Sequence, residues 1–242
     1  MIELKYGTQL SPTPIKLSIG TLRKPKLKEI AEIGFDEFNL FETFAKMTPE
    51  LWFTKIKGED GKSFWCSLSE EERSKIALYD IMLSDKSLID VYLAIFNFFF
   101  VEPVVFYDDN FLILDHTIED LSGLTSDDIY GIICKESFIQ VLEVIQRICC
   151  IYEKMLKAKQ AEKKKSDDNM TLPNIISAVS NRHPSITPIT VWELTIFQLL
   201  DSFERLRDNA FYEIEKTRVS VWGDEKKTFD AALWYKNNYD KK

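Results

Sequence analysis

Glycine and proline are scarce in this sequence, with only 8 of each among 242 residues. A β-sandwich with many turns needs more of both, so their scarcity argues against that fold class. Charged residues make up 29% of the chain and hydrophobic residues 45%, enough apolar material for one large domain or two closely packed ones. We therefore predict a mainly α fold, in which a helical bundle-like body carries a small β element.

Histidine is rarer still. His116 and His183 are the only two, and they stand far apart, whereas a metal site needs His, Cys or carboxylate side chains clustered at ligand spacing. The sequence also lacks the G-x-S-x-G motif of serine hydrolases, and no cysteine has a histidine near it. We predict no catalytic residue, no metal site and no cofactor, and hence a protein that is not an enzyme.

A phosphate-binding loop is suggested only by the segment GEDGKS, residues 58–63. The Walker pattern requires a glycine five residues before Gly61, and Ile56 stands there. Glu59 and Asp60 also place negative charge where a phosphate would lie. We interpret this segment as a solvated surface loop.

Cysteine pairs and secretion signals are also lacking. None of Cys66, Cys134, Cys149 and Cys150 forms a C-x-x-C motif, and a disulfide between the adjacent Cys149 and Cys150 would be strained. The chain starts without a basic segment followed by an apolar one, so no signal peptide is evident. We expect reduced thiols in a reducing cytosol.

The net charge of the chain and the length of its longest apolar run argue against membranes and nucleic acids as partners. The longest apolar run, residues 88–103, contains Asp90 and Asn97 and is shorter than the ~20 residues of a membrane-spanning helix. The net charge of −8 repels phosphate backbones and anionic lipids. The lysine-rich run at 154–165 is better explained as charge that complements a helix C-terminus than as a nucleic-acid patch.

The periodicity of apolar residues predicts the local structure. It indicates strands at 2–6 and 14–20, helices at 27–34 and 35–47, a helix at 69–83 capped by Ser69 and Glu72, a helix at 88–101, a hairpin at 104–114, a long helix at 126–164, a polar linker at 166–171 and a helix at 172–181. We expect three regions, 1–54, 55–165 and 172–242, with the last packing on the centre to give one compact unit.

A further helix is predicted after the approach HPSITP, residues 183–188. Thr187 before Pro188 is one helix start, and Thr190 with Glu193 is another. An apolar stripe with helical spacing follows, comprising Ile189, Trp192, Ile196, Leu199, Phe203 and Leu206. We expect His183 to belong to the entrance turn and not to a catalytic group.

Aromatic residues near the chain end are the candidates for partner contact. Trp222, Phe229 and Trp234 lie in a short charged segment with little core material around it, and Trp192 and Tyr235 are further candidates. Tryptophan and tyrosine supply large contact areas at interfaces. The alternative is that these rings lie in the core, as most aromatics at helical spacing do.

The segment PIKLSIGTLRKPKLKEIAEIG near the start, and HPSITPITVWELTIFQLLDSFERL followed by VSVWGDEKKTFDAALWY near the end, resemble the accessory tail proteins of tailed bacteriophages of Gram-positive hosts. These proteins are regarded as tail assembly chaperones or as tail and baseplate accessory proteins. The resemblance covers the two ends of the chain, about half of its length. The middle, 55–165, is similar only in helical character.

The resemblance implies a mainly helical protein of the host bacterial cytoplasm that engages other tail proteins. A chaperone would bind the tape-measure protein as client and the tail tube protein as second contact, in several copies. Such families carry no catalytic residues, so no active site is transferred.

Alternatives remain open at this point. The chain could be a structural tail or baseplate subunit that stays in the virion, or it could associate with itself. It could also be an enzyme that uses a carboxylate pair, or a host helical adaptor with no link to a phage.

Overall fold

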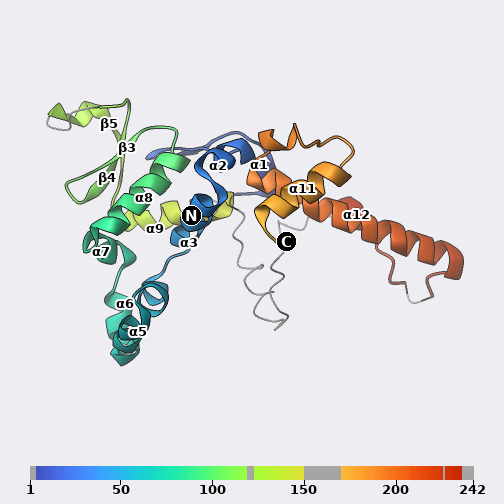
Figure 1. Cartoon of the computed structure of the whole chain (residues 1–242), viewed down its shortest axis with the longest axis horizontal. Coiled ribbons are helices and arrows are strands. Elements are labelled where there is room, and N and C mark those ends of the chain that lie inside the picture. Colours follow the sequence, from blue (N-terminus) through green and yellow to red (C-terminus); the bar gives the residue numbers. More distant parts are fainter. Residues whose placement is uncertain (1–3, 119–122, 150–169, 226, 236–242) are drawn as a thin grey trace. The chain divides into compact units, whose positions relative to one another are not determined.

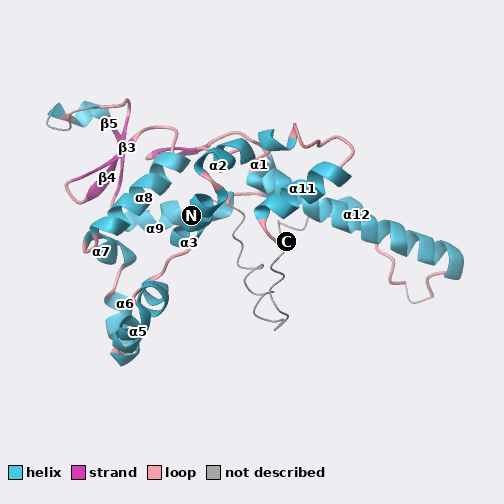
Figure 2. Ribbon diagram, in the orientation of Figure 1, coloured by secondary structure: helices cyan, strands magenta, loops and turns pink. Residues whose placement is uncertain are grey.

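The computed structural model describes residues 4–118, 123–149, 170–225 and 227–235 (Figure 1). The chain divides into two compact units that are interleaved in sequence. The first unit contains Pro14–Lys24 and Asp36–Cys149, and the second contains Ile2–Thr13, Pro25–Phe35 and Cys150–Lys242. The predicted mainly α class is confirmed, because α-helices and two small antiparallel sheets make up the described elements (Figure 2). The predicted division at 54 and 165 stays a prediction.

The first unit is a set of helices with both sheets. Its helices are α3 (Phe35–Ala45), α4 (Pro49–Leu51), α5 (Gly58–Ser67), α6 (Glu70–Lys75), α7 (Leu78–Leu83), α8 (Lys86–Phe99) and α9 (Lys135–Ile148), with a π-helix at Trp52–Ile56. Strands β1 (Ile15–Leu17) and β2 (Gly20–Leu22) form one hairpin, and β3 (Val104–Tyr107), β4 (Asn110–Leu114) and β5 (Ile129–Ile133) form a sheet in that order.

Aromatic side chains fill the core of this unit. Phe96 on α8 lies edge-to-face against Phe111 of β4, with ring centroids 4.8 Å apart, and Tyr92 meets Phe138 of α9 at 4.9 Å. The Tyr92 hydroxyl donates to the carbonyl of Phe44 at 3.2 Å, and burial raises the pKa of this tyrosine. The longest apolar run of the sequence is therefore mostly a core helix, α8, which packs against the sheet of β3, β4 and β5 through contacts such as Phe96 with Phe111.

The hairpin predicted at 104–114 is confirmed. Its two-residue turn places Asp108 and Asp109 at φ of 49° and 57°, the left-handed conformation that hairpin turns require and that aspartate tolerates. The prediction of a single strand near the N-terminus is only partly correct. The strand expected at 14–20 is two strands that turn between Leu17 and Gly20.

The prediction of a long helix at 126–164 is wrong at its start. Residues 126–128 form a 3₁₀ turn, and Ile129–Ile133 form β5, paired with β4; α9 begins only at Lys135. The apolar β-branched residues of this stretch complete the sheet instead of extending the helix. Residues 150–164 of the predicted helix, the lysine run, Cys150 and most of the linker lie outside the described residues.

The segment 58–63 is not a loop but the start of α5. Glu59 and Asp60 lie in its first turn, where the helix dipole favours negative charge. A Cβ on Gly61 would lie 2.5 Å from the carbonyl oxygen of Phe53, so glycine permits close packing against the π-helix. The segment therefore serves local packing.

The predicted helix at 69–83 is two helices. Ser69 and Glu72 form the expected capping box of α6, but the chain becomes extended at Ala77 before α7 begins. Helix α6 buries no residue, whereas α7 buries Leu78, Tyr79, Ile81 and Met82. After this break, the apolar residues of α7 lie in the core.

The second unit is helical. It contains α1 (Tyr6–Leu10), α2 (Leu27–Ile33), α11 (Leu172–Arg182), α12 (Ile196–Trp222) and 3₁₀ turns at Val191–Glu193 and Leu233–Tyr235. The helices predicted at 27–34 and 172–181 are confirmed, and Gly34 ends α2 at φ 95°. The strand expected at 2–6 is wrong where the structure describes it, because Tyr6 opens α1 and packs on α12.

Candidate protein-interaction surface

The 27-residue helix α12 is the longest helix described and carries the candidate site. It begins later than the sequence indicated. Thr195, and not Thr187 or Thr190, is its N-cap, and the side chains of Thr195 and Gln198 form a capping box. Thr187 and Thr190 instead hydrogen-bond to each other in the approach turn.

The approach turn also uses His183. Its Nδ1 accepts hydrogen bonds from the backbone N–H groups of Ser185 and Ile186, each at 3.2 Å. The predicted place of His183 in the entrance turn is thus confirmed. Ile189, the first member of the predicted stripe, is 85% exposed, while Ile196 and Leu199 are buried.

The first turns of α12 are fixed by α1. The hydroxyl of Tyr6 lies 3.1 and 3.2 Å from the two carboxylate oxygens of Asp201, and Arg205 approaches both the Tyr6 hydroxyl and Asp201. Burial raises the pKa of Asp201, against the opposing effects of the Tyr6 hydrogen bond and of Arg205. The Gln198 amide donates to the Leu10 carbonyl at 2.8 Å. This half of α12 is therefore joined to α1 by several side-chain hydrogen bonds.

A second anchor precedes α12. Glu193 accepts hydrogen bonds from Lys26 at 2.6 Å and from Lys28 at 2.8 Å. These two contacts lower the pKa of Glu193 to about 2. The Leu27 N–H also donates to the Leu194 carbonyl at 2.9 Å, so α2 is tied to the start of α12 by backbone and side chains.

The second half of α12 presents apolar side chains to solvent. Phe211, Ile214, Val221 and Trp222 are 55%, 65%, 63% and 76% exposed. At ~100° per residue these positions span an arc of about 100° on the helix. We call these four residues the α12 face. Such an apolar stripe normally packs against another element.

A return segment covers the neighbouring side of the helix. Gly223, at φ 75°, ends α12, and Asp224 accepts hydrogen bonds from the N–H groups of Thr228 and Phe229 at 2.9 Å each. The Phe229 ring then packs on Tyr212 of α12, with centroids 5.5 Å apart. The return segment, residues 224–225 and 227–235, leaves the four side chains of the α12 face exposed.

Two basic residues, Arg218 within the arc of the α12 face and Lys216 outside it, are paired with glutamates of the same helix. Lys216 lies 3.3 Å from Glu213, and Arg218 lies 2.8 Å from Glu215. Arg218 also donates to the Thr228 hydroxyl at 3.3 Å. A shallow hollow lies here, lined by Glu213, Ile214, Thr217, Arg218 and Trp222. The surface thus offers apolar contact with little net charge.

The predicted partner-contact residues fall into two groups. Trp222, Trp234 and Tyr235 are exposed, and the rings of the last two pack edge-to-face at 5.0 Å. Phe229 and Trp192 are half-buried, and Phe229 is engaged by Tyr212. The sequence interpretation missed Phe211, Ile214 and Val221, because it ended the apolar stripe at Leu206. The spacing of three and seven residues that relates Phe211, Ile214 and Val221 to one another is the signal that could have found them.

No arrangement typical of metal binding is seen in the described part of the chain. Within it, no three His, Cys, Asp or Glu side chains form a group that could hold a metal ion. Within that part, Cys66, Cys134 and Cys149 are not joined to one another by a disulfide. None of the helices described is sufficiently long and apolar to cross a membrane.

Comparison with protein-family models shows a match over part of the chain. Residues 162–239, about a third of the chain, match the family model "YomV second domain", and YomV is a Bacillus prophage (SPβ) protein. The matched range includes α11, α12 and the return segment. No match is found among curated proteins or among solved structures. The α12 face therefore lies in a part of the chain that is similar to a domain of a prophage protein.

Proposed function

We propose that this chain is a non-enzymatic assembly protein of a prophage tail module, and that it acts as a tail assembly chaperone in the host bacterial cytoplasm. The α12 face carries the proposal. Four large apolar side chains lie exposed on the second half of a helix whose first half is held by α1. The face also lies within residues 162–239, which match the prophage domain.

The free energy that burying the α12 face would contribute supports binding to another protein. Fully burying one large apolar side chain contributes ~1.5–3 kcal/mol, and tryptophan is frequent among the residues that dominate interfaces. Trp222, the most exposed member of the face, is therefore the residue from which we expect the largest contribution.

The spacing of the face supports a helical partner. Phe211, Ile214 and Val221 recur at intervals of three and seven residues, the pattern by which one amphipathic helix docks on another or in an apolar groove. A long helical client with exposed apolar stripes fits this mode. The tape-measure protein is such a client, and the tail tube protein is the second contact that the resemblance implies.

Charge supports protein over nucleic acid as the partner. The chain carries a net charge of −8, and the basic residues Lys216 and Arg218 of α12 are paired with glutamates. Little positive charge is left there to hold a phosphate backbone.

Co-expression tests the proposal directly. The chain is produced with the tape-measure and tail tube proteins encoded in the same prophage, and each is tested for co-purification with it. Retention of the tape-measure protein supports the chaperone function. Absence of association with any tail protein, in cells and in lysate, would contradict it.

The fate of the protein distinguishes a chaperone from a subunit. Mass spectrometry of purified particles should not detect a chaperone, because it leaves before the tail is complete. Detection at a fixed copy number per particle would instead assign the chain to the virion tail or baseplate.

A further inference from the structure

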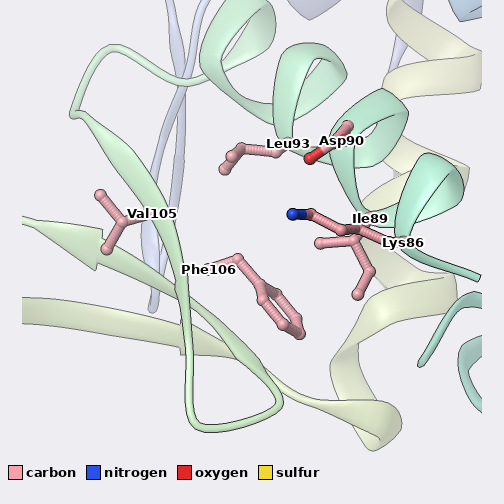
Figure 3. A pocket seen from close by; sticks show the side chains of 6 residues that line it. All are labelled: Lys86, Ile89, Asp90, Leu93, Val105 and Phe106. Atoms are coloured by element: carbon pink, nitrogen blue, oxygen red, sulfur yellow. The ribbon is translucent and has the colours of Figure 1, made fainter.

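A groove lies between α8 and β3 in the first unit. Lys86, Ile89, Asp90 and Leu93 line it on the helix, and Val105 and Phe106 line it on the strand. Figure 3 shows Lys86, Ile89 and Leu93 reaching from α8 toward β3. The groove has a volume of about 600 Å³, within the ~300–1,000 Å³ typical of ligand sites.

Asn97, four residues after Leu93 on α8, hydrogen-bonds to the backbone of β3. Its amide nitrogen donates to the Val104 carbonyl at 2.8 Å, and its amide oxygen accepts from the Val104 N–H at 3.0 Å. The side chain of Asn97 therefore occupies the outer edge of β3 in the way that a neighbouring strand would.

Phe106 is the next residue of β3 whose backbone N–H and C=O groups point away from β4, and these groups have no such partner in the described part of the chain. Leu114 N–H donates to the Pro103 carbonyl, and the strand register pairs Val105 with Leu112 and Phe106 with Phe111. Bonded and non-bonded pairs alternate along an antiparallel ladder, so the N–H and C=O groups of Phe106 point away from β4. Among the described residues nothing hydrogen-bonds to them. The groove thus combines apolar walls with one free backbone donor and one free acceptor.

We propose that the α8–β3 groove binds an extended peptide segment, which pairs with Phe106 at the edge of β3. An extended backbone is the partner that supplies an acceptor and a donor at the spacing of one strand residue. The peptide residue paired with Phe106 places its side chain on the same face of the sheet as the Phe106 ring. We therefore expect a bulky apolar residue at that position. This site is independent of the α12 face and of the proposed function.

A short synthetic peptide tests the site on the full chain. The probe is acetyl-Thr-Thr-Leu-Thr-Thr-amide, titrated into ¹⁵N-labelled protein while the amide signals of Phe106 and Leu93 are followed. Two further probes carry an N-methyl group, either on the leucine or on the threonine after it. An N-methyl group removes one donor, so methylation of the leucine should weaken binding roughly fivefold or more. Methylation of the threonine should have little effect, because its N–H faces away from β3.

A matched pair of variants tests the location. Leu93→Glu places a charge in the groove, whereas Ala94→Glu places the same charge on the neighbouring exposed position of α8. We expect at least about tenfold weaker binding for Leu93→Glu and unchanged binding for Ala94→Glu. A melting curve of each variant verifies that it is folded.

The peptide titrations can overturn the proposal in three ways. The amide signal of Phe106 would not shift at millimolar concentrations of the probe, or methylation of the leucine and of the threonine would weaken binding equally. The third is equal affinity of the Leu93→Glu and Ala94→Glu variants for the probe. A groove filled by β3 of a second copy would appear as a concentration-dependent dimer without the probe, and that result would also contradict a peptide as the occupant.

Discussion

The hydroxyl of Tyr6 lies within hydrogen-bond distance of both carboxylate oxygens of Asp201, two residues that are 195 positions apart in the sequence. This contact joins α1 to the buried half of α12, and the capping box at Thr195 and Gln198 fixes the same end. Because one end of α12 is held in this way, the other end can present apolar side chains without losing its helical structure.

Replacing Tyr6 by phenylalanine should destabilise the second unit. The ring contact with Phe197 is kept, but the buried Asp201 loses the donor that faces it. We expect a loss of about 1–3 kcal/mol in the free energy of unfolding, measured in urea. Tyr107→Phe is the control, because Tyr107 is exposed and no described residue bonds to its hydroxyl. An equal effect of the two changes would show that the Tyr6–Asp201 contact does not stabilise the unit.

The Glu193→Gln variant should show a stability deficit that depends on pH. Lys26 and Lys28 lower the pKa of Glu193 from 4.5 to about 2, so the folded state binds this proton less tightly than the unfolded state. The stabilisation is then complete above pH 4.5, falls as the pH drops from 4.5 to 2, and is absent below that range.

Melting temperatures of the wild type and Glu193→Gln at several pH values give this comparison. The difference should be present at pH 5–7, shrink toward pH 2 and decrease at high salt. Glu225→Gln, at an exposed position without an ion pair to any described residue, should show no such trend. A deficit that is constant from pH 7 to pH 2 would contradict the assignment to the two lysines.

Gly131→Ala should destabilise the first unit strongly. An added Cβ would lie 2.1 Å from the carbonyl oxygen of Ile19, and backbone atoms of a packed hairpin cannot yield easily. We expect a loss of about 1–3 kcal/mol, or more if β5 detaches. Gly123→Ala, where no atom lies within 4 Å of the new Cβ, should change stability by less than ~0.5 kcal/mol. Equal denaturation midpoints for the two variants would contradict the close packing of β5.

The sequence predicted those elements whose signals are local. The capping box at Ser69, the turn at Asp108 and Asp109, and the glycine end of α2 each depend on residues a few positions apart, and all three are observed. Elements decided by distant contacts were misassigned. Ile129–Ile133 is a strand because β4 lies beside it, and Tyr6 is helical in a segment that packs on α12.

The candidate surface was only partly predictable for the same reason. Trp222, Trp234 and Tyr235 stand out by residue type, and they are exposed. Phe211, Ile214 and Val221 have the spacing of an ordinary core helix, and only the structure shows that the elements packed on α12 do not cover them. Phe229 is the opposite case. Its residue type suggested a partner contact, but its ring packs on Tyr212 within the chain.

The central claim is that the α12 face binds a tail protein, and the most direct measurement compares Ile214→Glu with Ser220→Glu in a quantitative pull-down of the tape-measure protein. Both positions are exposed on α12, but only Ile214 belongs to the face. The account predicts at least about tenfold weaker binding for Ile214→Glu, since a charge would be buried against the partner, and wild-type binding for Ser220→Glu. Equal retention of the tape-measure protein by both variants would contradict the claim.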